Sequence, residues 1–118
     1  MMEFKDIPWK DKISEDDLIA VYKDKYPVTP GHLLVVPKRN DLSSLGEAVK
    51  YAVSIGNHQV ATGVWDGFNI GMNNGEAAGQ TVMWPHIHLI PRHWGDVEDP
   101  VGGVRNTIPG KGNYRKEK

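Results

Sequence analysis

The chain has 118 residues, a formal net charge of −1 and no cysteine. These features exclude disulfides, thiolate metal sites and a cysteine nucleophile, and they give no general basic surface for binding nucleic acid. With 39% hydrophobic and 25% charged residues, the composition is that of a globular protein, and the length predicts one domain over residues 1–118. Because no apolar run reaches the length of a signal peptide or a membrane span, we expect a cytoplasmic protein with no membrane partner.

Two strands and a helix are predicted in the first half of the chain. The segments 18–26 (LIAVYKDKY) and 32–38 (HLLVVPK) are short apolar runs, separated by the turn-forming PVTPG. From residue 44 to 62 apolar side chains recur at every third or fourth position, and Ser44 with Glu47 forms a capping-box signature. These patterns predict a helix over residues 44–62.

Two further strands are predicted in the second half, at residues 67–73 (GFNIGMN) and 81–91 (TVMWPHIHLIP). The order strand, strand, helix, strand, strand is typical of an α+β fold. We therefore expect an antiparallel sheet of about five strands with one main helix on one face. The glycine-bearing residues 97–118 predict an irregular C-terminal extension.

His86 and His88 flank a single residue in the last predicted strand, so both imidazoles and Trp84 should share one face. Such a pair is compatible with a hydrogen-bonded core, with a metal site or with nucleophilic attack on phosphorus. The candidates for completing a metal site are His32, His93 and Asp96. Because no cysteine is available and no carboxylate is suitably spaced, we expect no metal. Phosphate-binding groups nearby would favour the third interpretation.

Three blocks of the sequence resemble the histidine-triad (HIT) superfamily. GQTVMWPHIHLIPR (79–92) is similar to its signature strand, G-Q-[ST]-V-x-H-x-H-x-H-x-x-P-R. VYKDKYPVTPGHLLVVPKRN (21–40) and FNIGMNNGEAAGQTV (68–82) are similar to its G-H block and to its phosphate loop. The resemblance covers about residues 13–96 with the family spacing kept. It implies a HIT-like fold, action on a nucleotide without a cofactor or metal, and a homodimer.

The resemblance also assigns roles to the histidines. His86 aligns with the family nucleophile, and His88 and His32 align with the supporting histidines of the catalytic group. Trp84 stands where the family has its first histidine, which is usually a hydrogen-bonding support. Pro85 is a second departure, although the distantly similar galactose-1-phosphate uridylyltransferases also carry proline before the nucleophile.

The remaining site residues are expectations from family position. The substrate ligands implied are Asn73, Gln80 and Thr81 for the phosphates and bridging oxygen, Asp24 for a ribose hydroxyl, and Tyr22 and Ile13 for the base. Further candidate base contacts are Ile7, Pro8 and Trp9. Gly75 and Gly79 would let backbone N–H groups approach a phosphate closely.

We therefore expect a nucleotidyl hydrolase or transferase acting at the α-phosphorus of nucleoside phosphate esters, anhydrides or phosphoramidates. The expected path runs through a covalent nucleotidyl-histidine on His86. The alternative is a nucleotide-binding module with little or no turnover, because the triad lacks its first histidine.

Overall fold

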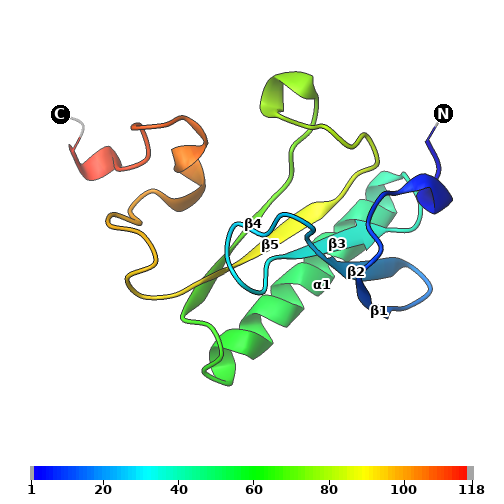
Figure 1. Cartoon of the computed structure of the whole chain (residues 1–118), viewed down its shortest axis with the longest axis horizontal. Helices are drawn as coiled ribbons and strands as arrows, with labels where there is room; N and C mark the ends of the chain where they lie inside the picture. The colour runs from blue at the N-terminus through cyan, green and yellow to red at the C-terminus, as the bar shows by residue number, and fades with distance from the viewer. Residues whose placement is uncertain (1, 117–118) are drawn as a thin grey trace.

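The computed structural model describes residues 2–116, and it places one helix against one face of a five-stranded antiparallel sheet (Figure 1). The sheet has the order β1-β2-β3-β5-β4. The strands are β1 (Lys12–Glu15), β2 (Ile19–Lys23), β3 (Leu33–Pro37), β4 (Gly67–Gly71) and β5 (Ile87–Arg92), and the helix is α1 (Leu42–Ala61). The 3-10 turns are η1 (Phe4–Asp6), η2 (Glu76–Ala78), η3 (Gly103–Thr107) and η4 (Tyr114–Lys116). The predicted α+β fold is confirmed.

The two faces of the sheet carry separate cores because successive strand residues point to opposite sides. The core under α1 contains Ile19, Val21, Leu33, Val35, Ala48, Ala52, Trp65, Ile87 and Leu89. The core on the other face contains Ile7, Ala20, Tyr22, Leu34, Val36 and Trp84. Since Leu34 pairs with His88, the His88 side chain belongs to this second face, away from the helix.

Helix α1 begins earlier than predicted. Asp41 is the N-cap, and its carboxylate accepts a hydrogen bond from the Ser44 N–H at 2.7 Å, so the predicted cap at Ser44 is wrong. The buried stripe consists of the small residues Ser44, Ala48, Ala52 and Gly56. Gly56 lies so close to the Phe68 ring that a Cβ there would clash at 2.6 Å. The aliphatic residues that suggested the helix lie partly outside this stripe, with Val49, Val53 and Val60 exposed.

Strand β5 begins at Ile87 and not at Thr81 as predicted. The β3–β5 register pairs Val35 with Ile87, so two further steps would place Pro37 opposite Pro85. Neither proline has a backbone N–H, and the ladder therefore stops before that point. The Trp84 indole N–H donates to the Pro37 carbonyl instead, at 2.8 Å.

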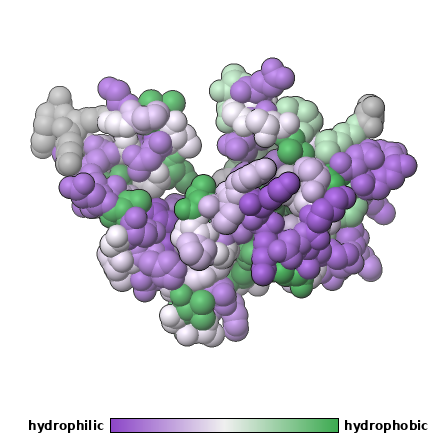
Figure 2. Space-filling model, viewed as in Figure 1, coloured by the Kyte–Doolittle hydropathy of each residue, from purple (hydrophilic) through white to green (hydrophobic). Residues whose placement is uncertain are grey.

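Strand β1 was not predicted because all four of its residues are exposed, Ile13 is its one apolar residue, and no apolar alternation marks it. At the other end, the C-terminal segment and the loop around η2 stand on either side of a notch (Figures 1 and 2). The face seen in Figure 2 is mainly hydrophilic, with scattered hydrophobic residues. No helix among residues 2–116 is long and apolar enough to cross a membrane.

Candidate active site

A cavity of about 340 Å³ lies on the helix-free side of the sheet and brings distant segments together. Its lining comes from the N-terminal segment, the loop after β2, the loop around η2 and the start of β5. Of the predicted site residues it contains Asp24, Asn73, Gln80, Thr81, His86 and His88. Lys25, Tyr26 and Val82 also line it and were not predicted. Lys25 and Tyr26 directly follow Asp24 in the sequence, and this position could have indicated that they line the same cavity.

His86 is held in one tautomer by the backbone. Its Nδ1 lies 2.8 Å from the Trp84 carbonyl oxygen, which can only accept a hydrogen bond, so Nδ1 carries the proton. In the neutral ring Nε2 then keeps its lone pair. The contact uses the main chain of Trp84, and so it does not depend on which side chain occupies position 84.

His32 and His88 form a second ordered pair behind His86. The Val28 N–H donates to His32 Nδ1 at 3.1 Å, which leaves the proton of neutral His32 on Nε2. That Nε2 lies 2.9 Å from His88 Nδ1 and 3.3 Å from Asp24 Oδ2. His88 Nδ1 is therefore the acceptor, and the remaining proton of His88 resides on Nε2.

Burial keeps all three imidazoles neutral. It lowers the pKa of His86, where the hydrogen bond to Trp84 and the charge of Asp24 act in the opposite direction. Burial and the neighbouring His86 and His32 lower the pKa of His88 to about 4. The pKa of His32 is also lowered by burial, against the attraction of Asp24. Near pH 7 His86 is thus a neutral base with a free lone pair, and His88 is a neutral donor.

Among the described residues, Asp24, His32 and His88 form a group that could hold a metal ion. One carboxylate oxygen and one ring nitrogen from each histidine lie within 4.8 Å of one another. For His32 Nε2 to bind a cation it would have to release the proton that its contact with Val28 places there. The other metal candidates lie elsewhere. Asp96 accepts from Arg92, and His93 lies at the far end of β5, 3.8 Å from Asp66.

Hydrogen bonds of the Gln80 side chain hold the loop around η2 together. The Gln80 side-chain oxygen accepts from the Gly75 N–H at 2.8 Å, and its amide nitrogen donates to the Val82 carbonyl at 3.0 Å. Gly75 and Gly79 have φ angles of 95° and 90°, a region that favours glycine. Gln80 therefore fixes the shape of the loop and borders the cavity, while Asn73 and Thr81 line the same wall.

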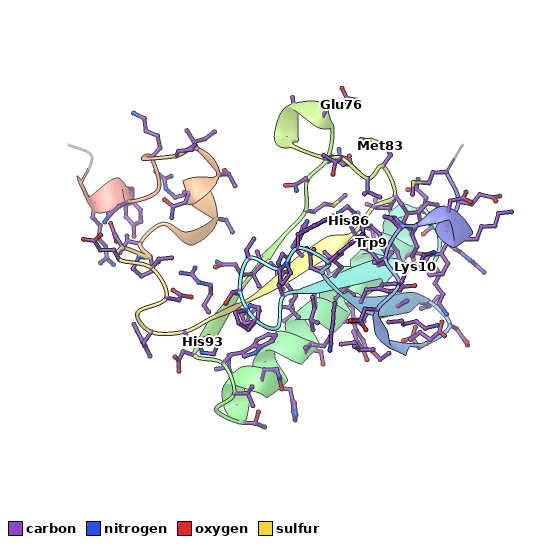
Figure 3. The ribbon with its side chains drawn as sticks, viewed as in Figure 1. Trp9, Lys10, Glu76, Met83, His86 and His93 are labelled. Carbon is purple, nitrogen blue, oxygen red and sulfur yellow. The ribbon has the colours of Figure 1, made fainter. Side chains whose placement is uncertain are left out.

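The residues expected around the base are divided between cavity and core. Pro8 and Trp9 line the cavity, and Figure 3 shows Trp9 beside His86. Ile7 and Tyr22 are buried in the core beneath them and are not among the lining residues. Ile13 is 48% exposed on β1 and lies outside the cavity lining.

Trp84 shares the face of His88 but does not border the cavity as its strand position predicted. Its side chain is buried in the core with Ile7 and with Phe4, whose ring centroid is 6.2 Å from that of Trp84. Two departures from the simple strand pattern, the prolines and the indole hydrogen bond to Pro37, account for this placement.

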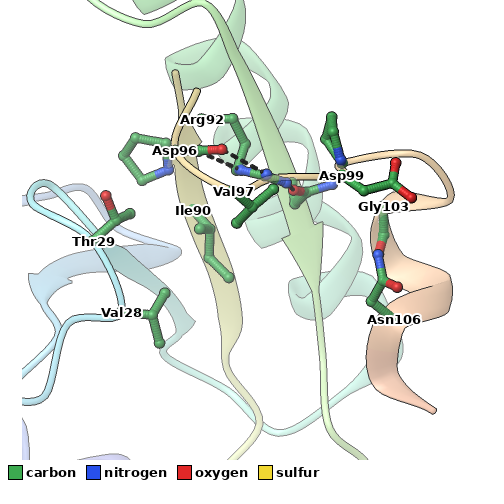
Figure 4. A pocket seen from close by; sticks show the side chains of 12 residues that line it. Val28, Thr29, Ile90, Arg92, Asp96, Val97, Asp99, Gly103 and Asn106 are labelled. Carbon is green, nitrogen blue, oxygen red and sulfur yellow. Dashed lines mark hydrogen bonds and ion pairs between the residues drawn. The ribbon is translucent and has the colours of Figure 1, made fainter. Parts of the chain in front are cut away.

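A second cavity, of about 460 Å³, lies between β5, the 28–29 loop and the C-terminal segment (Figure 4). Arg92 crosses it, donating to Asp96 at 2.7 and 2.9 Å and to Asn69 at 2.7 Å. None of the predicted catalytic histidines lines it. Arg105 of the extension does not line the His86 cavity either; it donates to the Gly112 carbonyl at 3.0 Å.

The comparisons with known proteins agree with this geometry. A profile of the HIT domain matches residues 8–95. A HIT-like protein of Methanocaldococcus jannaschii is 36% identical over 80% of this chain and 79% of its own. The adenylylsulfatase HINT3 of Arabidopsis thaliana is 38% identical over 69% of this chain and 45% of its own. A zinc-bound histidine triad family protein from Mycobacterium smegmatis superposes with a TM-score of 0.69 and 33% identity, covering 78% of this chain and 71% of that one.

The antiparallel sheet, the paired histidines and the glycine-bearing loop define an α+β protein with a cavity lined by histidine. The chain belongs to the HIT family, and at the level of the family it is a nucleotide hydrolase or transferase.

Proposed function

We propose that the chain cleaves nucleoside phosphate esters, anhydrides or phosphoramidates at the α-phosphorus through a nucleotidyl-His86 intermediate. The observation that carries the proposal is the hydrogen bond between His86 Nδ1 and the Trp84 carbonyl, which leaves Nε2 as a free lone pair on a neutral ring. A relative described as an adenylylsulfatase supports an adenylyl anhydride among the substrates.

In the first step His86 Nε2 forms a bond to the α-phosphorus, and the bond from phosphorus to the leaving group breaks. His88 Nε2–H donates a hydrogen bond to the leaving atom, which takes its proton from solvent, and His32 and Asp24 hold His88 in the tautomer that can donate. In the second step water attacks the phosphorus and gives its proton to solvent, the P–N bond breaks with its electron pair returning to His86 Nε2, and nucleoside monophosphate is released. Asn73 and Thr81 hold the phosphate oxygens, and Asp24 borders the position of the ribose.

The size of the site agrees with a single nucleotide unit. A volume of about 340 Å³ is at the small end of the ~300–1,000 Å³ typical of ligand pockets. Pro8 and Trp9 provide an apolar wall for a base, and the exposed residues Lys25 and Tyr26 also line the cavity.

The test compares the parent with His86→Asn. A screen of dinucleoside polyphosphates, nucleoside phosphoramidates and adenylyl sulfate first identifies a substrate. We expect His86→Asn to lose at least about a thousandfold in kcat/KM, while adenosine monophosphate binding stays within about tenfold, because the nucleophile contributes to chemistry more than to ground-state affinity.

His93→Asn is the matched control, since His93 is exposed at the far end of β5 (Figure 3). It should cleave like the parent. Nucleotide binding without any cleavage by the parent would instead assign the chain as a nucleotide-binding module.

We also infer that the chain acts as a homodimer. Strand β4 is at one edge of the sheet, with β5 on one side and no described strand on the other. An exposed edge of this kind is a ready site for pairing with another chain.

A further inference from the structure

Trp9 packs directly on the proposed nucleophile. The ring centroids of Trp9 and His86 are 4.6 Å apart, with the planes inclined at 55°. Both side chains line the cavity, and they come from segments far apart in the sequence (Figure 3). No other aromatic residue is recorded within ring-contact distance of His86 among the described residues, apart from its neighbour His88 at 5.2 Å.

The N-terminal segment fixes Trp9 from both sides. Two residues before it, Ile7 is buried in the core, and two residues after it the Asp11 carbonyl accepts from the Lys23 N–H at 2.9 Å. The indole also lies against Tyr22, with ring centroids 6.4 Å apart. Trp9 is thus anchored to β2 and to the core, and it is half-buried where it meets His86.

The remaining restraint on the His86 ring is a single hydrogen bond. That bond, from Nδ1 to the Trp84 carbonyl, fixes the tautomer but permits the ring to tilt about the N···O line. A large rigid side chain against the ring removes this freedom and excludes water from one side. In this chain, where Trp84 occupies the position of a supporting histidine and points into the core, such a restraint has to come from elsewhere.

We propose that Trp9 is a positioning residue for His86, which holds the imidazole with Nε2 directed at the phosphorus and shields it from water. The proposal rests on the proposed function of His86. It gives Trp9 a role at the nucleophile in addition to its place in the wall beside the base.

Loss of the Trp9 indole should change the protonation of His86, because the pKa of His86 is lowered chiefly by burial. The titratable and charged groups around it are His88 on β5, and Asp24 and Lys25 in the loop after β2. Removing the indole changes none of these charges but admits water. The pKa of His86 should therefore rise toward the ordinary value of histidine, and less of the neutral nucleophile should exist at acid pH.

The experiment titrates the imidazole resonances of His86 by NMR in the parent, Trp9→Ala, Trp9→Phe and Trp94→Ala. Trp94 is 87% exposed and serves as the matched tryptophan control. We expect Trp9→Ala to raise the pKa of His86, Trp9→Phe to restore most of the parent value, and Trp94→Ala to leave it unchanged. In turnover, Trp9→Ala should lose up to about tenfold more kcat at pH 5.5 than at pH 8, the limit reached if the pKa of His86 returned fully to 6.5.

Two results would overturn the proposal. One is a His86 titration in Trp9→Ala that matches the parent, in a variant shown to be folded by its amide spectrum. The other is a rise in KM alone with an unchanged pH profile of kcat, which would assign Trp9 to the base. The NMR measurement needs no catalysis. A parent without turnover would therefore contradict the proposed function, and the titration would still show whether Trp9 controls the pKa of His86.

Discussion

At the scale of single residues, the site depends on which atoms carry protons. Two backbone groups decide this: the Trp84 carbonyl places a proton on His86 Nδ1, and the Val28 N–H places the proton of His32 on Nε2. His86 Nε2 is then left with a free lone pair, and His32 Nε2 is left as a donor to His88. Because the contact to His86 is made by main chain, this hydrogen bond does not require a particular side chain at position 84.

Trp84→His tests this view of position 84. The indole is buried and donates to the Pro37 carbonyl, so a smaller ring leaves a void, and we expect the free energy of unfolding to fall by about 2–4 kcal/mol. Single-turnover cleavage should not become faster, since the bond to His86 is already present. Urea unfolding and rapid-quench kinetics on the same preparation measure both. A faster enzyme of unchanged stability would show that the histidine is functionally missing.

At the scale of elements, the sequence predicted what local pattern determines. The apolar runs around Val21 and Val35 are strands because both of their faces are buried, and the central helix buries one face of small residues. Strand β1 was missed because its pairing with β2 is made by backbone and leaves no apolar pattern. The start of β5 was predicted too early because Pro37 and Pro85, which stop the hydrogen-bond ladder, are far apart in sequence.

The residues of the candidate site were also predicted only in part. The motifs that resemble the HIT family brought Asp24, His86 and His88 to one cavity, together with the loop that carries Gln80. The depth of each residue was not predictable. Tyr22 and Trp84 lie on the correct face but in the core, because the N-terminal segment covers them, and its path depends on contacts such as Ile7 with the core and Trp9 with His86.

The edge strand β4 gives a prediction at this scale. The radius of gyration is 15.0 Å, against about 13.5 Å for a compact domain of this length, because the C-terminal segment stands away from the sheet (Figure 1). That segment exposes Val104, Ile108 and Tyr114. We expect a second copy to pair along β4 and to cover these side chains. Sedimentation equilibrium at micromolar concentration should give twice the chain mass, and a monomer at all concentrations would contradict this arrangement.

At the scale of the whole molecule, the buried His32 and His86 and the half-buried His88 make stability depend on pH. Their folded pKa values are lowered, so the unfolded chain binds protons first, and stability is fully present above about pH 6.5 and falls as the pH approaches the folded values. For His88, with a pKa of about 4, the loss between pH 7 and pH 5 is about 2 kcal/mol.

Urea unfolding at pH 7 and pH 5 measures this loss, and His88→Asn should reduce it. The carboxylates do not interfere, because ion pairs with Lys12 and Arg92 lower the pKa values of Glu15 and Asp96, and their contributions disappear only at more acid pH. Equal stability at pH 7 and pH 5 would mean that the histidines are hydrated in solution.

The central claim is that His86 becomes covalently nucleotidylated, and the most direct measurement is to trap that species. Enzyme in excess is mixed with a cleavable nucleoside phosphate, quenched in alkali because phosphohistidine bonds are labile in acid, digested, and sequenced by fragmentation mass spectrometry. The account predicts a nucleoside monophosphate group on His86 within the first turnover, and none on the peptide from His86→Asn. Release of nucleoside monophosphate with His86 unmodified at every time point, or with the group on His88, would contradict it.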